Sequence, residues 1–175
     1  AVDDGIDADP LADAGGVDAI THGADDAGEL VPGNAGESHE GVVAVDDVHV
    51  ALNAKVISAG GSISINATGG ILQNTVEADI ETQEAGRTIE LLAGLDITMV
   101  DGAQTTTNTG DISYEATTGD ITLGQLDATG ADVAVEATQG SIVDTGSDLN
   151  DPDIRADMLI LQAGGNIGTS GDPME

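Results

Sequence analysis

Five segments of this sequence repeat one pattern, and this repeat constrains the fold more than any other feature. Each copy reads apolar-x-apolar-x-Ala and is followed by a glycine-containing turn and an isoleucine. The copies are SISINATGGI, TIELLAGLDI, DISYEATTGDI, DVAVEATQGSI and MLILQAGGNI, whose first aliphatic residues are Ile63, Ile89, Ile112, Val133 and Leu159. Such alternation is typical of a short strand with one buried face. A recurring internal period indicates stacked repeats.

The spacing of the copies predicts the architecture. Successive first positions are 26, 23, 21 and 26 residues apart, which leaves room for about three short strands and their turns. We therefore expect an all-β fold, a right-handed parallel β-helix (β-solenoid) of about five to six coils over residues 42–175. The handedness follows the right-handed bias of parallel crossovers. Residues 50–54, VALNA, are interpreted as a weaker, earlier copy of the repeat.

Stacking places equivalent residues above one another inside the predicted solenoid. The first and third positions are aliphatic except for Tyr114, the fifth is always alanine, and the next strand always opens with isoleucine. We call each vertical row of equivalent residues a ladder. The large apolar side chains in these four ladders contribute roughly 1.5–3 kcal/mol each to the stability of the fold when buried. We expect the alanine ladder to fill a tight corner that accepts no larger side chain.

Composition agrees with a narrow, aliphatic interior. Tyr114 is the one aromatic residue of the chain, and there is no cysteine, so disulfides and thiolate metal sites are excluded. The 33 acidic and 3 basic residues give a net charge of −30, which argues against nucleic acid as a partner because phosphate binding needs Lys and Arg. No apolar run reaches 18 residues, so we expect no membrane insertion.

Residues 1–41 form a separate acidic leader rich in Ala, Gly and Asp. Its residues 1–40 hold 11 acidic residues and no Lys or Arg. High net charge with low hydrophobicity is typical of disorder, but small apolar residues recur throughout it. We therefore leave open whether the leader is disordered or acts as a capping or joining segment.

The segments GDITL, GSISINATGGI and LILQAGGNIGTSGDPME resemble the repeat shaft of filamentous-haemagglutinin-type exoproteins, the large adhesins of bacterial two-partner secretion. The resemblance covers about residues 42–175, and GGNIGTSGDPME is its most specific part. It implies a right-handed β-helix, export to the bacterial cell surface, and a role in adhesion or surface structure. The secretion domain of that family is not recognisable, so we expect a repeat unit or fragment of a longer protein.

Glu115 and Glu136 occupy the same slot in two adjacent copies, between inward positions, so both are expected to point outward. Two interpretations stay open. In the first, both carboxylates are solvated, and salt screens their mutual repulsion of about 1 kcal/mol in water. In the second, the two carboxylates share a calcium ion, which prefers six to eight oxygen ligands. The turn residues Asp111, Asp120 and Asp132 complete the candidate ligand set. The segment DDGIDADP only approaches a calcium-loop motif.

An enzymatic site is not indicated. Polysaccharide-cleaving β-helices need a base or a carboxylate pair beside a sugar, with aromatics to stack the ring. Here Lys55, Arg87 and Arg155 fall in unlike repeat positions, and aromatics are nearly absent. We expect no catalysis and no cofactor other than the calcium considered above.

Three smaller features are assigned to structure. His22, His39 and His49 lack metal-ligand spacing and are expected to be exposed. The segment TTTNT at residues 105–109 occurs once and is interpreted as a polar loop, not as an ice-binding array. The sequon-like residues 66–68 are interpreted as part of a strand.

These features predict a non-enzymatic structural or adhesive protein, secreted or on the bacterial cell surface. It would be a solenoid segment of a large exoprotein, or a subunit that stacks head to tail, because solenoid ends expose unpaired strands. Its partners would be other copies, neighbouring repeats, or a host or neighbouring-cell surface. The alternative is a calcium- or glycan-binding surface module that uses its acidic face.

Overall fold

The structure is a computed structural model and describes residues 41–45, 49–146, 152–170 and 174, with side chains from residue 49 onward. Residues 1–40 of the leader, with His22, His39 and DDGIDADP, therefore lie outside the described residues. Every regular element within the described part is a β-strand, and no helix there could cross a membrane.

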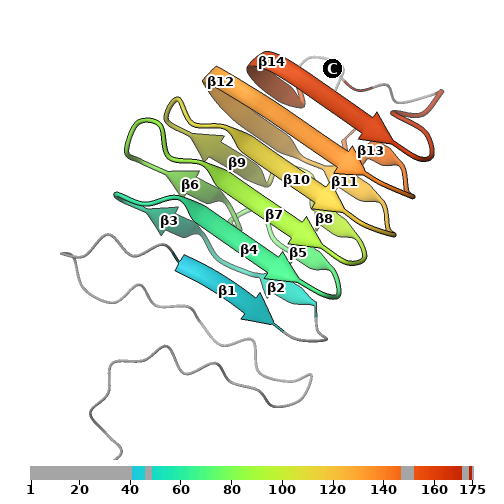
Figure 1. Cartoon of the computed structure of the whole chain (residues 1–175), viewed down its shortest axis with the longest axis horizontal. Helices are drawn as coiled ribbons and strands as arrows, with labels where there is room; N and C mark the ends of the chain where they lie inside the picture. The colour runs from blue at the N-terminus through green and yellow to red at the C-terminus, as the bar shows by residue number, and fades with distance from the viewer. Residues whose placement is uncertain (1–40, 46–48, 147–151, 171–173, 175) are drawn as a thin grey trace, which may run out of the picture. The chain divides into compact units, whose positions relative to one another are not determined.

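The strands stack in parallel as a β-solenoid of about five turns with three faces (Figure 1). The first face holds β1 (Gly41–Val45), β4 (Ile63–Ala67), β7 (Ile89–Ala93) and β10 (Ile112–Ala116). The second face holds β2 (Val50–Leu52), β5 (Ile71–Gln73), β8 (Ile97–Met99), β11 (Ile121–Leu123) and β13 (Ile142–Asp144). The third face holds β3 (Val56–Ser58), β6 (Ile80–Thr82) and β9 (Gln104–Thr107).

Two long strands join the third face to the first. In β12 (Gln125–Ala137), the beginning of the strand pairs with β9 and its end pairs with β10. The last strand, β14 (Ile154–Ala163), follows β12 across the same corner, with a register shift between Ala128 and Asp132. These strands therefore merge two faces into one continuous sheet.

The register of the first face confirms the predicted repeat. Ile63 pairs with Ile89, Ile89 with Ile112, Ile112 with Val133, and Val133 with Leu159. The isoleucines that open the second face also stack, from Ile71 through Ile97, Ile121 and Ile142 to Ile167. Residues 66 and 67 lie within β4, as the interpretation of the sequon-like segment required.

Two assignments from the sequence are wrong. VALNA is not an earlier copy of the first-face motif: Val50 pairs with Ile71, so it opens the second face, and β1 supplies the earlier first-face strand. The segment TTTNT is not simply a loop, because Thr105 and Thr107 lie in β9 and are buried. Both errors arise because stacking, not local composition, decides which face a short segment joins.

The interior is a column of aliphatic ladders with one polar cluster. Ile71, Ile89 and Leu91 are fully buried, and the alanine ladder (Ala67, Ala93, Ala116, Ala137) is at most 2% exposed. The polar cluster consists of Gln73, Thr105 and Tyr114. The Tyr114 hydroxyl donates to Gln73 Oε1 at 3.1 Å and is hydrogen-bonded to Thr105 Oγ1 at 2.6 Å. Within the described residues, no buried side-chain polar atom lacks a partner.

Candidate functional site

The structure brings the two repeated glutamates together. Glu115 on β10 and Glu136 on β12 are register partners in neighbouring parallel strands, which lie ~4.8 Å apart. Both side chains are on the outer surface, Glu115 exposed and Glu136 partly buried. Thus the predicted adjacency of these two carboxylates is confirmed.

The row formed by these glutamates contains no further acid. Glu115 has Leu92 as its other neighbour in the row, and Glu136 has Gln162. The Gln162 carboxamide donates to Glu136 Oε1 at 3.1 Å, and the Thr138 hydroxyl donates to the same oxygen at 3.4 Å. Neutral donors therefore already satisfy part of the hydrogen-bonding capacity of Glu136.

The three candidate aspartates lie elsewhere. Asp111 directly precedes β10, and Asp132 lies within β12; each is four residues from its glutamate, or about 13 Å along an extended chain. Asp120 lies beyond the next turn, immediately before β11. The described residues contain no group of three or more His, Asp or Glu side chains placed to hold a metal. Calcium binding thus stays a prediction for the glutamate pair, not for one site of five ligands.

The aspartates instead take part in contacts between coils. Asp120 Oδ1 accepts the backbone N–H of Ser141 at 2.7 Å, and Asp111 Oδ1 accepts that of Asp132 at 3.1 Å. The same arrangement recurs below Asp120, where Asp96 Oδ1 accepts the Asp120 N–H at 2.8 Å. Each side chain therefore binds the backbone of the equivalent residue one coil later.

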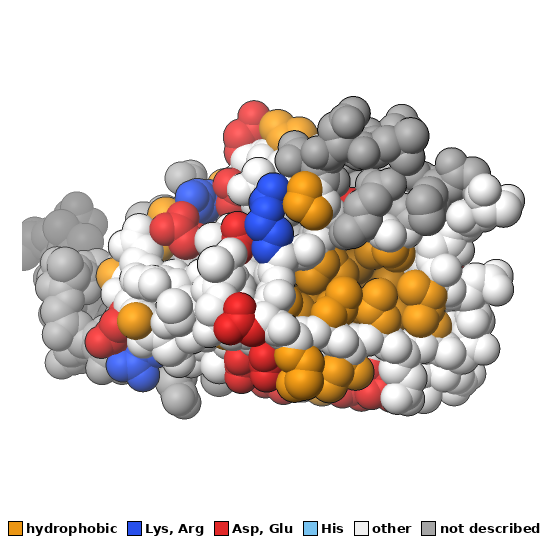
Figure 2. All heavy atoms as spheres, turned by 90° about the horizontal axis from the view of Figure 1, so that it is seen from above, with side chains coloured by type: hydrophobic (Ala, Val, Ile, Leu, Met, Phe, Trp, Pro, Cys, Tyr) orange, Lys and Arg blue, Asp and Glu red, His pale blue; other side chains and the backbone are white. Residues whose placement is uncertain are grey.

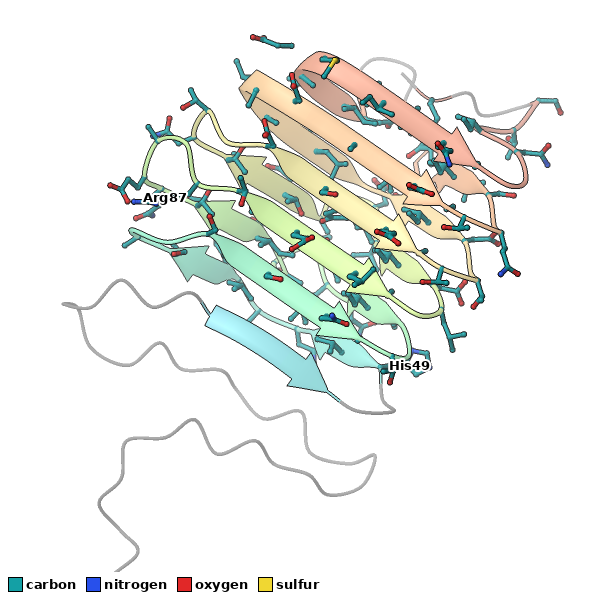
Figure 3. The ribbon with its side chains drawn as sticks, viewed as in Figure 1. His49 and Arg87 are labelled. Carbon is teal, nitrogen blue, oxygen red and sulfur yellow. The ribbon has the colours of Figure 1, made fainter. Side chains whose placement is uncertain are left out.

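We call the row before the second face the corner ladder; it consists of His49, Gly70, Asp96, Asp120, Ser141 and Asn166. At its start, His49 Nδ1 accepts the Gly70 N–H at 3.1 Å, and His49 is exposed as expected (Figure 3). At its end, Ser141 Oγ accepts the Asn166 N–H at 3.1 Å. Sequence reasoning missed this ladder, although its signal is visible as a residue with a side-chain acceptor before most of the second-face strands.

All three basic residues of the chain form ion pairs with carboxylates. Lys55 Nζ lies 2.6 Å from Glu81 Oε2, Arg87 lies 2.7 Å from Glu84 in the turn before β7 (Figure 3), and Arg155 lies 3.9 Å from Asp127. The hydrogen bond from Lys55 lowers the pKa of Glu81, and the same bond raises the pKa of Lys55. These pairs neutralise local charge on the outer faces, where exposed ion pairs contribute little to stability.

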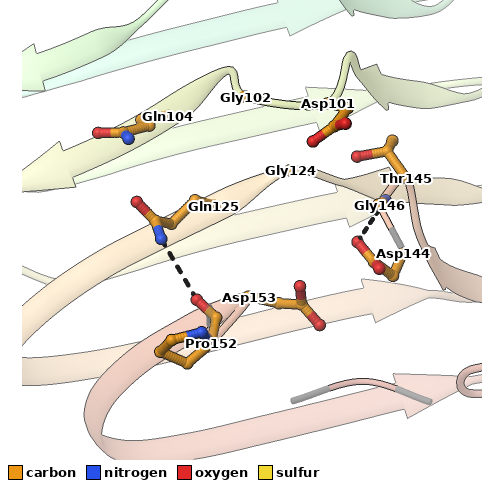
Figure 4. Close-up of a pocket in the computed structure, with 10 residues that line it drawn as sticks. All are labelled: Asp101, Gly102, Gln104, Gly124, Gln125, Asp144, Thr145, Gly146, Pro152 and Asp153. Carbon is orange, nitrogen blue, oxygen red and sulfur yellow. Dashed lines mark hydrogen bonds between the residues drawn. The ribbon is translucent and has the colours of Figure 1, made fainter. Parts of the chain in front are cut away.

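A shallow hollow lies where the second face turns into the third (Figure 4). It encloses about 100 Å³, which is small beside the roughly 300–1,000 Å³ of typical ligand pockets. Asp101, Asp144 and Asp153 line it; Asp144 accepts the Gly146 N–H, and Gln125 donates to the Pro152 carbonyl. The lining offers acceptors for water or a cation but no basic group and no aromatic ring.

Comparisons with protein-family models, with curated proteins and with solved structures found no match to this chain.

Proposed function

We propose that this chain is a non-enzymatic structural and adhesive module outside the cell, a length of β-solenoid shaft on a bacterial surface. The observation that carries the proposal is the uninterrupted stacking of the described coils, in which the same ladders recur from β4 to β14. Each added coil lengthens such a stack by ~4.8 Å. The module would hold adhesive or terminal parts away from the cell.

The charge of the chain supports an exposed, hydrated setting. A net charge of −30 on 175 residues keeps molecules apart and is tolerated where salt screens self-repulsion. The shallow hollow of Figure 4 and the paired basic residues add nothing typical of a carbohydrate-cleaving site. The proposed partners are neighbouring repeats, other copies, or a host or neighbouring-cell surface.

Immunogold labelling tests the location. An antibody raised against the solenoid should label intact producing cells as strongly as permeabilised cells. Label that appears only after permeabilisation would refute the surface assignment. Electron microscopy of the purified chain should show narrow rods or fibres, and compact round particles would refute the shaft.

A calcium- or glycan-binding module is the second candidate, and one observation favours it, the register pairing of Glu115 with Glu136. Two adjacent carboxylates attract a cation that reduces their repulsion. Under this proposal, millimolar calcium raises the melting temperature, and the double substitution Glu115→Gln, Glu136→Gln removes the rise. Glu90→Gln, at another outward position of the first face, serves as the matched control. An unchanged melting temperature of the unsubstituted protein would refute the calcium proposal.

A further inference from the structure

The last coil in the described part of the chain ends in an exposed apolar strand. On β14 and the turn after it, Met158, Leu159, Ile160 and Ile167 are 46–50% exposed. They are four of the seven exposed large hydrophobic residues in the described part of the chain. Figure 2, which views this end from above, shows hydrophobic side chains gathered there. Within the described residues, β14 pairs only with β12, so its other edge is unpaired.

Within the first face, neither of the two outermost described segments, β1 and residues 158–163 of β14, carries a charge. The first-face part of β14 reads MLILQA and β1 reads GVVAV, whereas β7, β10 and β12 each present an outward glutamate. Natural sheet edges are usually protected by charged residues or proline, and an unprotected hydrophobic edge is a site of strand pairing. In a chain with a net charge of −30, two uncharged outermost segments of the first face leave these edges without the charge that usually blocks strand pairing.

We propose that these two ends are complementary and that a second copy stacks its first coil on β14, head to tail. This inference rests on the proposed structural function and names the partner as another copy. The interface would repeat the contact already present between successive coils. Because every strand pair in the described part is parallel, a second copy must point the same way. Such a heterologous contact does not close and produces a filament.

The register of the joint follows from the ladders. Leu159, Leu161 and Ala163 end the three inward ladders of the first face. On β1, Gly41, Val43 and Val45 hold the corresponding register positions, opposite Ile63, Ile65 and Ala67. Stacking in this register therefore places aliphatic residues over Leu161 and Ala163 and a glycine over Leu159. On the second face, the joint places Val50 over Ile167.

The corner ladder supplies a polar contact for the same register. Asn166 ends this ladder, and no hydrogen bond from its carboxamide to a described residue is found. In every earlier coil with an acceptor at this position, the side chain accepts the N–H of the equivalent residue one coil later. The equivalent residue of a second copy is His49. The Asn166 carboxamide oxygen would therefore accept the His49 N–H across the joint.

Disulfide cross-linking tests this register, because the chain has no cysteine of its own. Ala44 and Gln162 hold the same outward row, so in the joint their Cα atoms are ~4.8 Å apart, within disulfide range. The double variant Ala44→Cys, Gln162→Cys should form dimers and longer products under oxidation in 1 M NaCl. The matched variant Ala44→Cys, Ile160→Cys places the thiols one row apart, roughly 7–8 Å between Cα atoms. It should cross-link at least ~5-fold more slowly, since Cα atoms more than about 7 Å apart rarely form disulfides.

A second variant tests the edge without engineered thiols. Ile160→Lys adds a charge to the outward side of β14 and should abolish assembly, measured by analytical ultracentrifugation in 1 M NaCl. Ser113→Lys, in the same outward row but on β10, is the matched control and should assemble normally. Equal cross-linking of both cysteine pairs, or a monomeric unsubstituted protein, would overturn the proposed joint. If the joint fails but the purified protein forms rods of single-chain length and the cells are labelled at their surface, the proposed shaft function stands. Loss of surface labelling would refute the shaft function independently of the joint.

Discussion

Tyr114 is the one aromatic side chain of the chain, and it lies inside the solenoid at 1% exposure. It occupies a ladder that also contains Ile65, Leu91 and Val135. Its phenol reaches across the interior to Gln73 and Thr105, so it links the three faces through hydrogen bonds. Burial raises the pKa of this phenol, and the hydrogen bond with Thr105 lowers it by a smaller amount. The aliphatic residues of the interior would pack similarly in several registers between coils, but the hydrogen bonds of the polar cluster form in only one of them.

We predict that Tyr114 resists ionisation for as long as the protein is folded. A group whose folded pKa is raised contributes stability below its unfolded pKa of 10.0, and that stability is lost as the pH rises above it. In an alkaline titration, phenolate absorbance should therefore appear only together with unfolding, monitored by circular dichroism. The chain in denaturant should titrate near the ordinary value. Phenolate formation near pH 10 in a fully folded sample would contradict this placement.

At the scale of single elements, small residues and hydrogen bonds at the turns determine where each short strand begins and ends. The alanine ladder leaves no space for longer side chains, since Ala93, Ala116 and Ala137 are fully buried and stacked. A Cβ added to Gly140 would lie 2.0 Å from the carbonyl oxygen of Gly119 in the coil below. The corner ladder adds a hydrogen bond at the start of the second-face strands. Small residues and side-chain acceptors thus set where the chain turns.

Ala116→Leu should destabilise the protein because it overpacks this corner. Inserting a larger side chain into a well-packed interior typically costs about 1–3 kcal/mol. We expect a melting temperature lower by several degrees, measured by circular dichroism. Thr117→Leu, one residue later and exposed, should leave the melting temperature nearly unchanged. Equal effects of the two substitutions would show that the alanine corner is not tight.

Substitution of Asp120 separates its structural role from calcium binding. Asp120→Ala removes the acceptor for the Ser141 N–H and should cost ~0.5–2 kcal/mol, as loss of a helix-capping side chain does. Asp120→Asn keeps an acceptor oxygen and should cost less than about 0.5 kcal/mol. Urea unfolding without calcium measures both, with Asp101→Ala in an exposed turn as control. A large loss in Asp120→Asn would instead point to a need for the charge.

At the scale of the whole molecule, electrostatic repulsion opposes compaction. The chain has 33 acidic and 3 basic residues, and all three basic residues are already paired. Most acidic charges of the solenoid lie on outer faces or turns, where dissolved ions reach them. Higher ionic strength should therefore stabilise the folded solenoid. It should also reduce the repulsion between two copies at the proposed joint.

We expect the melting temperature to rise when NaCl is increased from 10 mM to 1 M, because the screening length falls from about 30 Å to 3 Å. Choline chloride should give a similar rise, since screening does not depend on the identity of the cation. A melting temperature independent of both salts would contradict dominant self-repulsion. A rise with only one salt would indicate specific ion binding.

The sequence by itself determined the repeat, the strands of two faces and the pairing of Glu115 with Glu136. In the strands of the first and second faces, apolar residues alternate with others and recur at nearly constant spacing. This pattern favours one register between coils, because a slip of one residue would turn every large side chain outward. The third face escaped prediction for the opposite reason. Its strands follow turns of unequal length, with four residues between Ile121 and Leu126 and eleven between Ile142 and Ile154.

Only the tertiary structure decided what the polar residues do. An aspartate before a strand is equally suited to calcium and to a backbone N–H, and the sequence alone favoured neither. The neighbouring coil brings a specific N–H to within 2.7 Å of Asp120. Likewise Gln73 and Thr105, which are polar residues, are buried because Tyr114 from a later coil supplies a hydrogen-bond partner to each. Contacts between coils, which no local pattern contains, assign these roles.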